Sequence, residues 1–62
     1  MYIYTIYKNS STGDVVIKYI VNEANETIAE ANARAQAALE SLKSESEDPD
    51  SIKMKRRLVP SI

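Results

Sequence analysis

The sequence predicts a small α+β domain in which two strands are followed by a helix and a third strand. Three observations support this order. Two runs of β-branched and aromatic residues flank a short polar loop, an alanine-rich stretch follows, and a last run alternates apolar and cationic residues. A chain of 62 residues has room for one domain, so we assign residues 1–62 to a single folding unit.

The first two runs are typical of a β-hairpin. Residues 2–8 and 15–21 are almost all β-branched or aromatic, which favours strands. The polar segment between them contains Gly13, the only glycine of the chain, and a lone glycine in a tight loop indicates a backbone with positive φ. We therefore expect a four-residue loop that pairs Asn9 with Asp14.

The alanine-rich stretch predicts a helix from Glu26 to Leu42 or Lys43, since it contains neither Gly nor Pro. Asn25 is the expected N-cap. If the helix starts slightly later, Thr27 and Glu30 have the spacing of a capping box. One apolar stripe recurs at helical spacing and consists of Ile28, Ala31, Ala35, Ala38, Leu39 and Leu42. The acidic segment 44–50 follows as a loop that contains Pro49.

The third strand is predicted over residues 51–59, ahead of Pro60. Its alternation directs Ile52, Met54 and Leu58 to one face and Lys53, Lys55, Arg57 and Val59 to the other. Arg56 falls on the apolar side, so it must extend to solvent, pair with a helix acid or mark a bulge. Because antiparallel pairs are the more common, we expect a mainly antiparallel sheet in the order 2-1-3, with the helix on one face.

The hairpin register divides the side chains between the two faces of the sheet. With Asn9 opposite Asp14, the face expected beneath the helix carries Tyr2, Tyr4, Ile6, Val15, Ile17, Tyr19 and Val21. The other face carries Ile3, Thr5, Tyr7, Val16, Lys18 and Ile20. No second helix is available in the sequence to cover this second face.

An uncovered sheet face that is apolar at its centre and basic at its rim is typical of a protein-binding surface. The expected partner-binding residues are Ile3, Tyr7, Val16, Lys18, Ile20, Lys53, Lys55 and Arg57. We therefore expect a non-catalytic module, an inhibitor or an adaptor, that binds another protein or a second copy of itself. An open alternative is that these β-branched residues serve strand formation alone.

Charge and composition exclude several classes of chemistry. The chain has no Cys and no His, so it lacks thiolate and imidazole metal ligands and the usual nucleophile–base pairs. The acidic segment 44–50 lacks the glycine and the closing glutamate of a calcium loop. We therefore expect no catalysis, no metal and no cofactor. The sequence shows no signal-peptide pattern and no apolar run of membrane-spanning length, so we expect a cytoplasmic protein.

Nucleic acid is the competing partner. The cations Lys53, Lys55, Arg56 and Arg57, with Tyr7 and Lys18 on the same open face, could hold phosphates and stack a base. Against this, the net charge is −1, whereas nucleic-acid-binding domains carry a basic excess, and lysines on an edge strand also prevent edge-to-edge pairing. In size and kind of surface the chain resembles small phage or mobile-element proteins that act by stoichiometric binding. That resemblance rests on no motif and assigns no residue.

Overall fold

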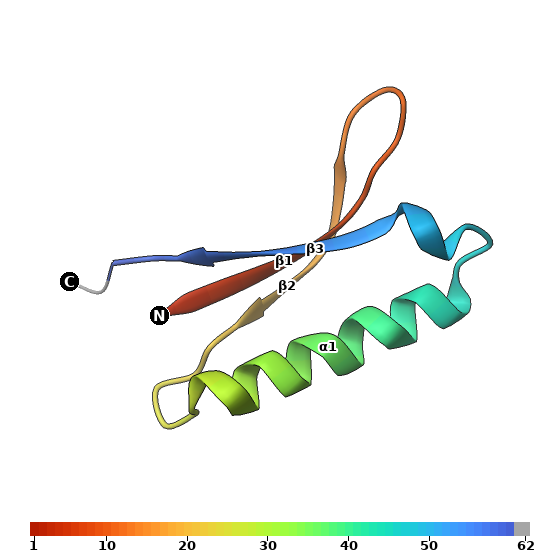
Figure 1. The fold of residues 1–62 in the computed structure, drawn as a ribbon. Coiled ribbons are helices and arrows are strands. Elements are labelled where there is room, and N and C mark those ends of the chain that lie inside the picture. Colours follow the sequence, from red (N-terminus) through yellow and green to blue (C-terminus); the bar gives the residue numbers. More distant parts are fainter. Residues whose placement is uncertain (61–62) are drawn as a thin grey trace.

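The computed structural model describes residues 1–60 as a three-stranded sheet with one helix packed on one of its faces (Figure 1). The strands are β1 (Tyr2–Lys8), β2 (Val15–Val21) and β3 (Ile52–Leu58). The helix α1 (Ile28–Glu45) connects β2 to a short 3₁₀ helix η1 (Pro49–Ser51), which leads into β3. The predicted α+β class and the bounds of the first two strands are confirmed, and β3 is one residue shorter at each end than expected.

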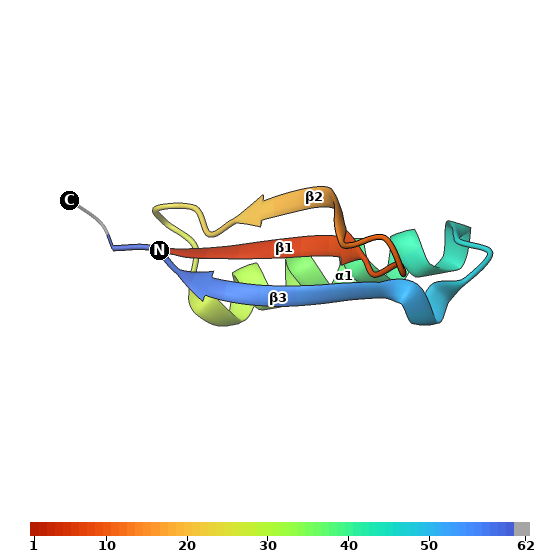
Figure 2. The same cartoon turned by 90° about the horizontal axis from the view of Figure 1, so that it is seen from above.

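The strand order is β2-β1-β3, and both pairs are antiparallel, as predicted. Strand β1 is central, and its pairing with β3 keeps one register from Tyr2 opposite Leu58 to Lys8 opposite Ile52. Figure 2 looks onto the sheet from the side opposite α1 and shows the helix running behind β1 and β3, roughly along the strands. One face of the sheet is therefore covered by α1, and the other has no layer upon it.

The hairpin turn forms for the reason that the sequence indicates. Gly13 has a φ of +124°, a region in which a side chain would strain the backbone. Its amide donates to the carbonyl of Ser10 at 3.1 Å, and the Ser10 hydroxyl donates to the Gly13 carbonyl at 2.6 Å. At the base of the loop, the side-chain amide of Asn9 donates to Asp14 at 3.1 Å. Asn9 and Asp14 thus face each other across the base of the loop, as expected.

The helix starts at Ile28, two residues later than the main expectation, and the alternative capping box is the one that forms. The backbone amide of Glu30 donates to the Thr27 hydroxyl at 3.1 Å, and the amide of Thr27 donates to the Glu30 carboxylate at 3.3 Å. Asn25 is therefore not the N-cap. A reciprocal box satisfies two helix N–H groups, whereas a single Asn cap satisfies one, which favours the later start.

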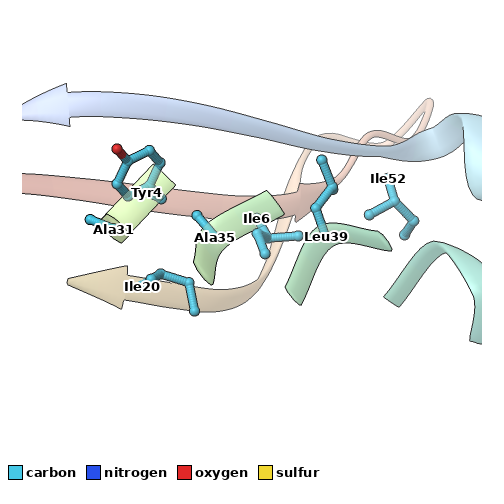
Figure 3. Close-up of a cluster of buried hydrophobic side chains, with 7 residues drawn as sticks. All are labelled: Tyr4, Ile6, Ile20, Ala31, Ala35, Leu39 and Ile52. Atoms are coloured by element: carbon cyan, nitrogen blue, oxygen red, sulfur yellow. The ribbon is translucent and has the colours of Figure 1, made fainter. Parts of the chain in front are cut away.

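The core lies between α1 and the sheet (Figure 3). Its two largest fully buried side chains are Tyr4 and Ile6 of β1. The helix contributes one alanine or leucine per turn, which lets it approach the central strand closely. The buried cluster consists of Tyr4, Ile6, Ile20, Ala31, Ala35, Leu39 and Ile52, with Tyr2, Ala38, Leu42 and Met54 packed at its margin. The predicted helix stripe is confirmed except at Ile28, which is half exposed at the first helical position.

A β-bulge in β2 overturns part of the predicted division between the faces. Near the turn, Tyr7 pairs with Val16 and Lys8 with Val15, the register that the hairpin loop predicts. Between Ile6 and Tyr7 the register shifts, so that Ile17 becomes the extra residue and Ile6 pairs with Lys18. One extra residue exchanges the two faces of the strand beyond it. The assignments of Tyr19 and Val21 to the covered face, and of Lys18 and Ile20 to the open one, are therefore wrong.

Three other residues expected in the core are largely exposed. Val15 and Ile17 are 61% and 42% exposed and belong to the half of β2 that follows the hairpin loop. The hairpin bends away from α1 at this end (Figure 1). Leu58 ends β3 and is 62% exposed.

Arg56 pairs with Tyr4 and lies, as expected, on the same side of β3 as its apolar residues. Its guanidinium lies 4.7 Å from the centre of the Tyr2 ring. A cation–π contact at the rim of the core is thus the way in which this charge is accommodated.

Candidate functional site

The open face of the sheet is a grid of three columns, one per strand. We define the open face as the nine side chains on the side away from α1: Ile3, Thr5 and Tyr7 of β1, Val16, Tyr19 and Val21 of β2, and Lys53, Lys55 and Arg57 of β3. The β2 column is wholly apolar or aromatic, and the β3 column is wholly cationic. The β1 column between them is half-buried. The face is thus divided lengthwise into an apolar side and a basic side.

Each row of the grid crosses the sheet through a residue of β1. Ile3 lies between Val21 and Arg57, because it pairs directly with both. Thr5 lies in the same way between Tyr19 and Lys55. The third row is centred on Tyr7, with Val16 on one side and Lys53 on the other. Direct cross-strand neighbours have Cβ atoms about 5 Å apart, so each row forms a contiguous strip.

All formal charges on the open face are positive, and they lie on β3. None of the three strands contains an Asp or Glu, so no acid on the sheet neutralises the cations of β3. Alternate residues of one strand are about 6.8 Å apart, which spaces these three charges evenly along it. The ammonium of Lys55 lies 5.1 Å from the centre of the Tyr7 ring, a cation–π contact that holds it over the face. The acids of the chain, in contrast, lie mostly in residues 23–50.

A shallow hollow of about 460 Å³ lies in the open face. Its lining includes Tyr19 and Val16 on the apolar side, Lys55 and Arg57 on the basic side, and Ile3 and Thr5 on its floor. Thr5 has the smallest side chain of the grid and lies in its central row. The larger side chains of its neighbours Tyr19 and Lys55 extend farther from the sheet. The hollow could hold a side chain or an edge of a partner that is apolar on one side and negative on the other.

Six of the eight predicted partner-binding residues lie together on this face: Ile3, Tyr7, Val16, Lys53, Lys55 and Arg57. The other two do not. Ile20 is 5% exposed and belongs to the core, and Lys18 lies opposite Ile6 on the helix side of the sheet. The bulge at Ile17 causes both corrections. It also places Tyr19 and Val21 on the open face, and Tyr19 is 61% exposed there.

A second group of charged side chains lies where β2 leads into α1, and its bonds are structural. Arg34 donates to both carboxylate oxygens of Glu26, at 2.8 and 3.0 Å, and to the carbonyl of Val21 at 2.7 Å. The backbone amide of Glu23 also donates to Glu26, at 3.0 Å. The Arg34 hydrogen bonds and the Glu23 amide lower the pKa of Glu26 to about 2. These bonds fasten the helix to the end of β2.

Other kinds of site find no support in the part of the chain that the structure describes. No three Cys, His, Asp or Glu side chains among residues 1–60 lie close enough together to hold a metal ion. No helix in this range combines the length and the apolar character needed to cross a membrane. No protein-family model, no curated protein and no solved structure matches the chain. The open face is therefore the candidate site on its own physical evidence.

Proposed function

We propose that the protein is a non-catalytic binding module that holds another protein on the open face, as a stoichiometric inhibitor or an adaptor. The observation that carries this proposal is the lengthwise division of the face into an apolar column on β2 and a cationic column on β3. Buried apolar and aromatic contacts supply affinity, while charges at the rim set orientation and association rate. The partner surface that fits is apolar with an acidic margin.

Charge favours a different protein over a second copy packed face to face. Two open faces brought together would set Lys53, Lys55 and Arg57 either against the same three cations or against the apolar β2 column of the second copy, and neither sheet supplies an acid to pair with them. Juxtaposed like charges in an interface cost several kcal/mol, and cations buried against apolar side chains without an acidic partner are likewise unfavourable. A homodimer through the open face is therefore the less favoured form of the proposal.

A second candidate function is single-stranded nucleic acid binding, favoured by one specific observation. The bulge brings Tyr19 onto the face that already carries Tyr7, so two aromatic rings lie beside three evenly spaced cations. Rings that stack bases beside a basic strip are the usual elements of a single-strand site. The net charge of −1 and the aliphatic residues Ile3, Val16 and Val21 favour the protein partner instead.

The test is comparative capture from a nuclease-treated native lysate with three immobilised proteins. The wild type is compared with a Tyr19→Lys, Arg57→Glu variant, which alters the open face, and with a Gln36→Lys, Glu40→Lys variant on the exposed side of α1. We expect a protein retained by the wild type and the helix variant and lost by the face variant. Equal retention by all three would contradict the proposal. A ligand that is captured only from a parallel lysate without nuclease treatment would favour nucleic acid.

A further inference from the structure

We infer that the element received by the open face is an amphipathic α-helix of the partner, lying along β1 above Thr5 with an acidic flank over β3. This inference rests on the proposed function and specifies the chemistry and shape of the partner. Three features of the sheet support it: both edges are protected against an added strand, the grid is about as wide as a helix, and its two outer columns differ in charge.

The edges of the sheet are poorly suited to an added strand. On β2, the bulge at Ile17 interrupts the regular ladder, and the carbonyl of Val21 already accepts a hydrogen bond from Arg34 at 2.7 Å. A bulge that twists an edge away is a common obstacle to strand addition. On β3, charged side chains project on both sides, with Arg56 toward the helix and Lys55 and Arg57 toward the open face. Charged edge strands are likewise protected.

The width of the grid fits a helix. The outer columns are separated by two strand spacings, about 9.6 Å, and a helix with its side chains is about 10–12 Å across. The hollow lies at Thr5 and extends toward Ile3, with Tyr19 on one side and Lys55 and Arg57 on the other. On the opposite face α1 already runs in this direction (Figure 2). A partner helix would complete a three-layer arrangement.

The two outer columns of the grid specify the two sides of that helix. On the β2 flank, Val16, Tyr19 and Val21 are 44%, 61% and 42% exposed, which leaves apolar surface to be buried. On the β3 flank, three cations recur about every 6.8 Å. Acids at positions i, i+4 and i+8 of a helix rise about 6 Å per step, close enough for flexible lysine and arginine side chains to reach them.

The test uses three synthetic peptides of about 20 residues, long enough to form isolated helices. All share one leucine stripe at helical spacing. The first carries glutamates along one flank, the second carries lysines there, and the third repeats the glutamate peptide with two interior prolines that prevent the helix. Fluorescence anisotropy measures their binding to the wild-type protein and to the Lys55→Glu, Arg57→Glu variant, whose fold is checked by circular dichroism.

We expect the glutamate helix to bind the wild type at least about tenfold more tightly than either control, and this preference to disappear in the variant. Equal binding of the proline peptide would contradict the inference that the partner element is a helix, but it would not contradict the proposed function. No binding, a preference for the lysine peptide, or displacement of the glutamate helix by an oligonucleotide would also overturn the inference. So would self-association in sedimentation that blocks the peptide, because a second copy would then occupy the face. The capture experiment tests the proposed function separately.

Discussion

Thr5 lies directly opposite Tyr19 on the open face, and the hollow lies beside that pair. The row continues to Lys55, which pairs with Thr5 from the other strand. A small residue between an aromatic ring and a long cation leaves space in this row, and the hollow extends from it toward Ile3. The position of Thr5 thus determines where a partner can approach the backbone of β1 most closely.

Thr5→Leu should fill the hollow. We expect the variant to fold with a free energy of unfolding within about 1 kcal/mol of the wild type, because the side chain is only half-buried. Binding of the captured partner should fall by at least about tenfold, since the added atoms occupy the contact. Isothermal titration calorimetry measures this loss, and Thr5→Val, which preserves the size, is the matched control. Unchanged affinity in Thr5→Leu would exclude the hollow from the interface.

Two neighbouring lysine substitutions test the bulge. Ile20→Lys places a charge in the core, where an unpaired buried charge costs several kcal/mol, so this small domain should unfold. Tyr19→Lys adds the same charge on the open face and should leave the far-ultraviolet circular dichroism spectrum unchanged. The opposite result, a folded Ile20→Lys and an unfolded Tyr19→Lys, is what a continuous register without the bulge would give.

The sequence was sufficient for the bounds of β1 and β2 because these depend on local signals, and the general preference for antiparallel pairs was sufficient for the strand order. Gly13 indicates the turn, and Pro60 follows the last strand. Thr27 and Glu30 have the spacing of a capping box in the sequence. Only the structure shows that this box, and not an Asn25 cap, starts the helix. The grouping of Lys53, Lys55 and Arg57 on one face also follows directly from alternation in β3.

The bulge could not be predicted in the same way. Ile17 stands between Val16 and Lys18 in a strand-forming segment that contains no glycine or proline to indicate a break in the ladder. The alternatives bury Tyr19 or Ile20 under the helix, and each is compatible with strand propensity. Packing decides between them, because Ile20 fits beside Ala31 and Ala35 of the closely packed helix (Figure 3). A local pattern contains no information on that fit.

Tyr4→Phe should stabilise the fold. The Tyr4 side chain is 1% exposed, and its hydroxyl has no hydrogen-bond partner among the described residues. A buried polar group without a partner costs about 1–3 kcal/mol, so removing the oxygen should raise the free energy of unfolding by about 1 kcal/mol. Chemical denaturation measures the change. A decrease of more than about 0.5 kcal/mol would show that the hydroxyl makes a stabilising bond after all.

The Glu26–Arg34 pair predicts a loss of stability in acid. The pKa of Glu26 is lowered from its usual 4.5 to about 2 in the folded state. A lowered folded-state pKa stabilises the fold above the unfolded value, and this stabilisation disappears as the pH falls from about 4.5 through about 2. Glu26→Gln should therefore differ from the wild type most at pH 6 and least near pH 2. A difference in denaturation midpoint that is constant over this range would contradict the assignment.

Cysteine protection tests the central claim, that the partner covers the open face, most directly. The chain has no cysteine, so a single substitution provides a unique probe. Thr5→Cys reports on the hollow, and Ala33→Cys reports on the exposed side of α1. The rate of maleimide modification is measured with and without the captured partner. We predict strong protection of Thr5→Cys and an unchanged rate at Ala33→Cys. Protection of Ala33→Cys with a freely reacting Thr5→Cys would place the partner on the helix and contradict the account.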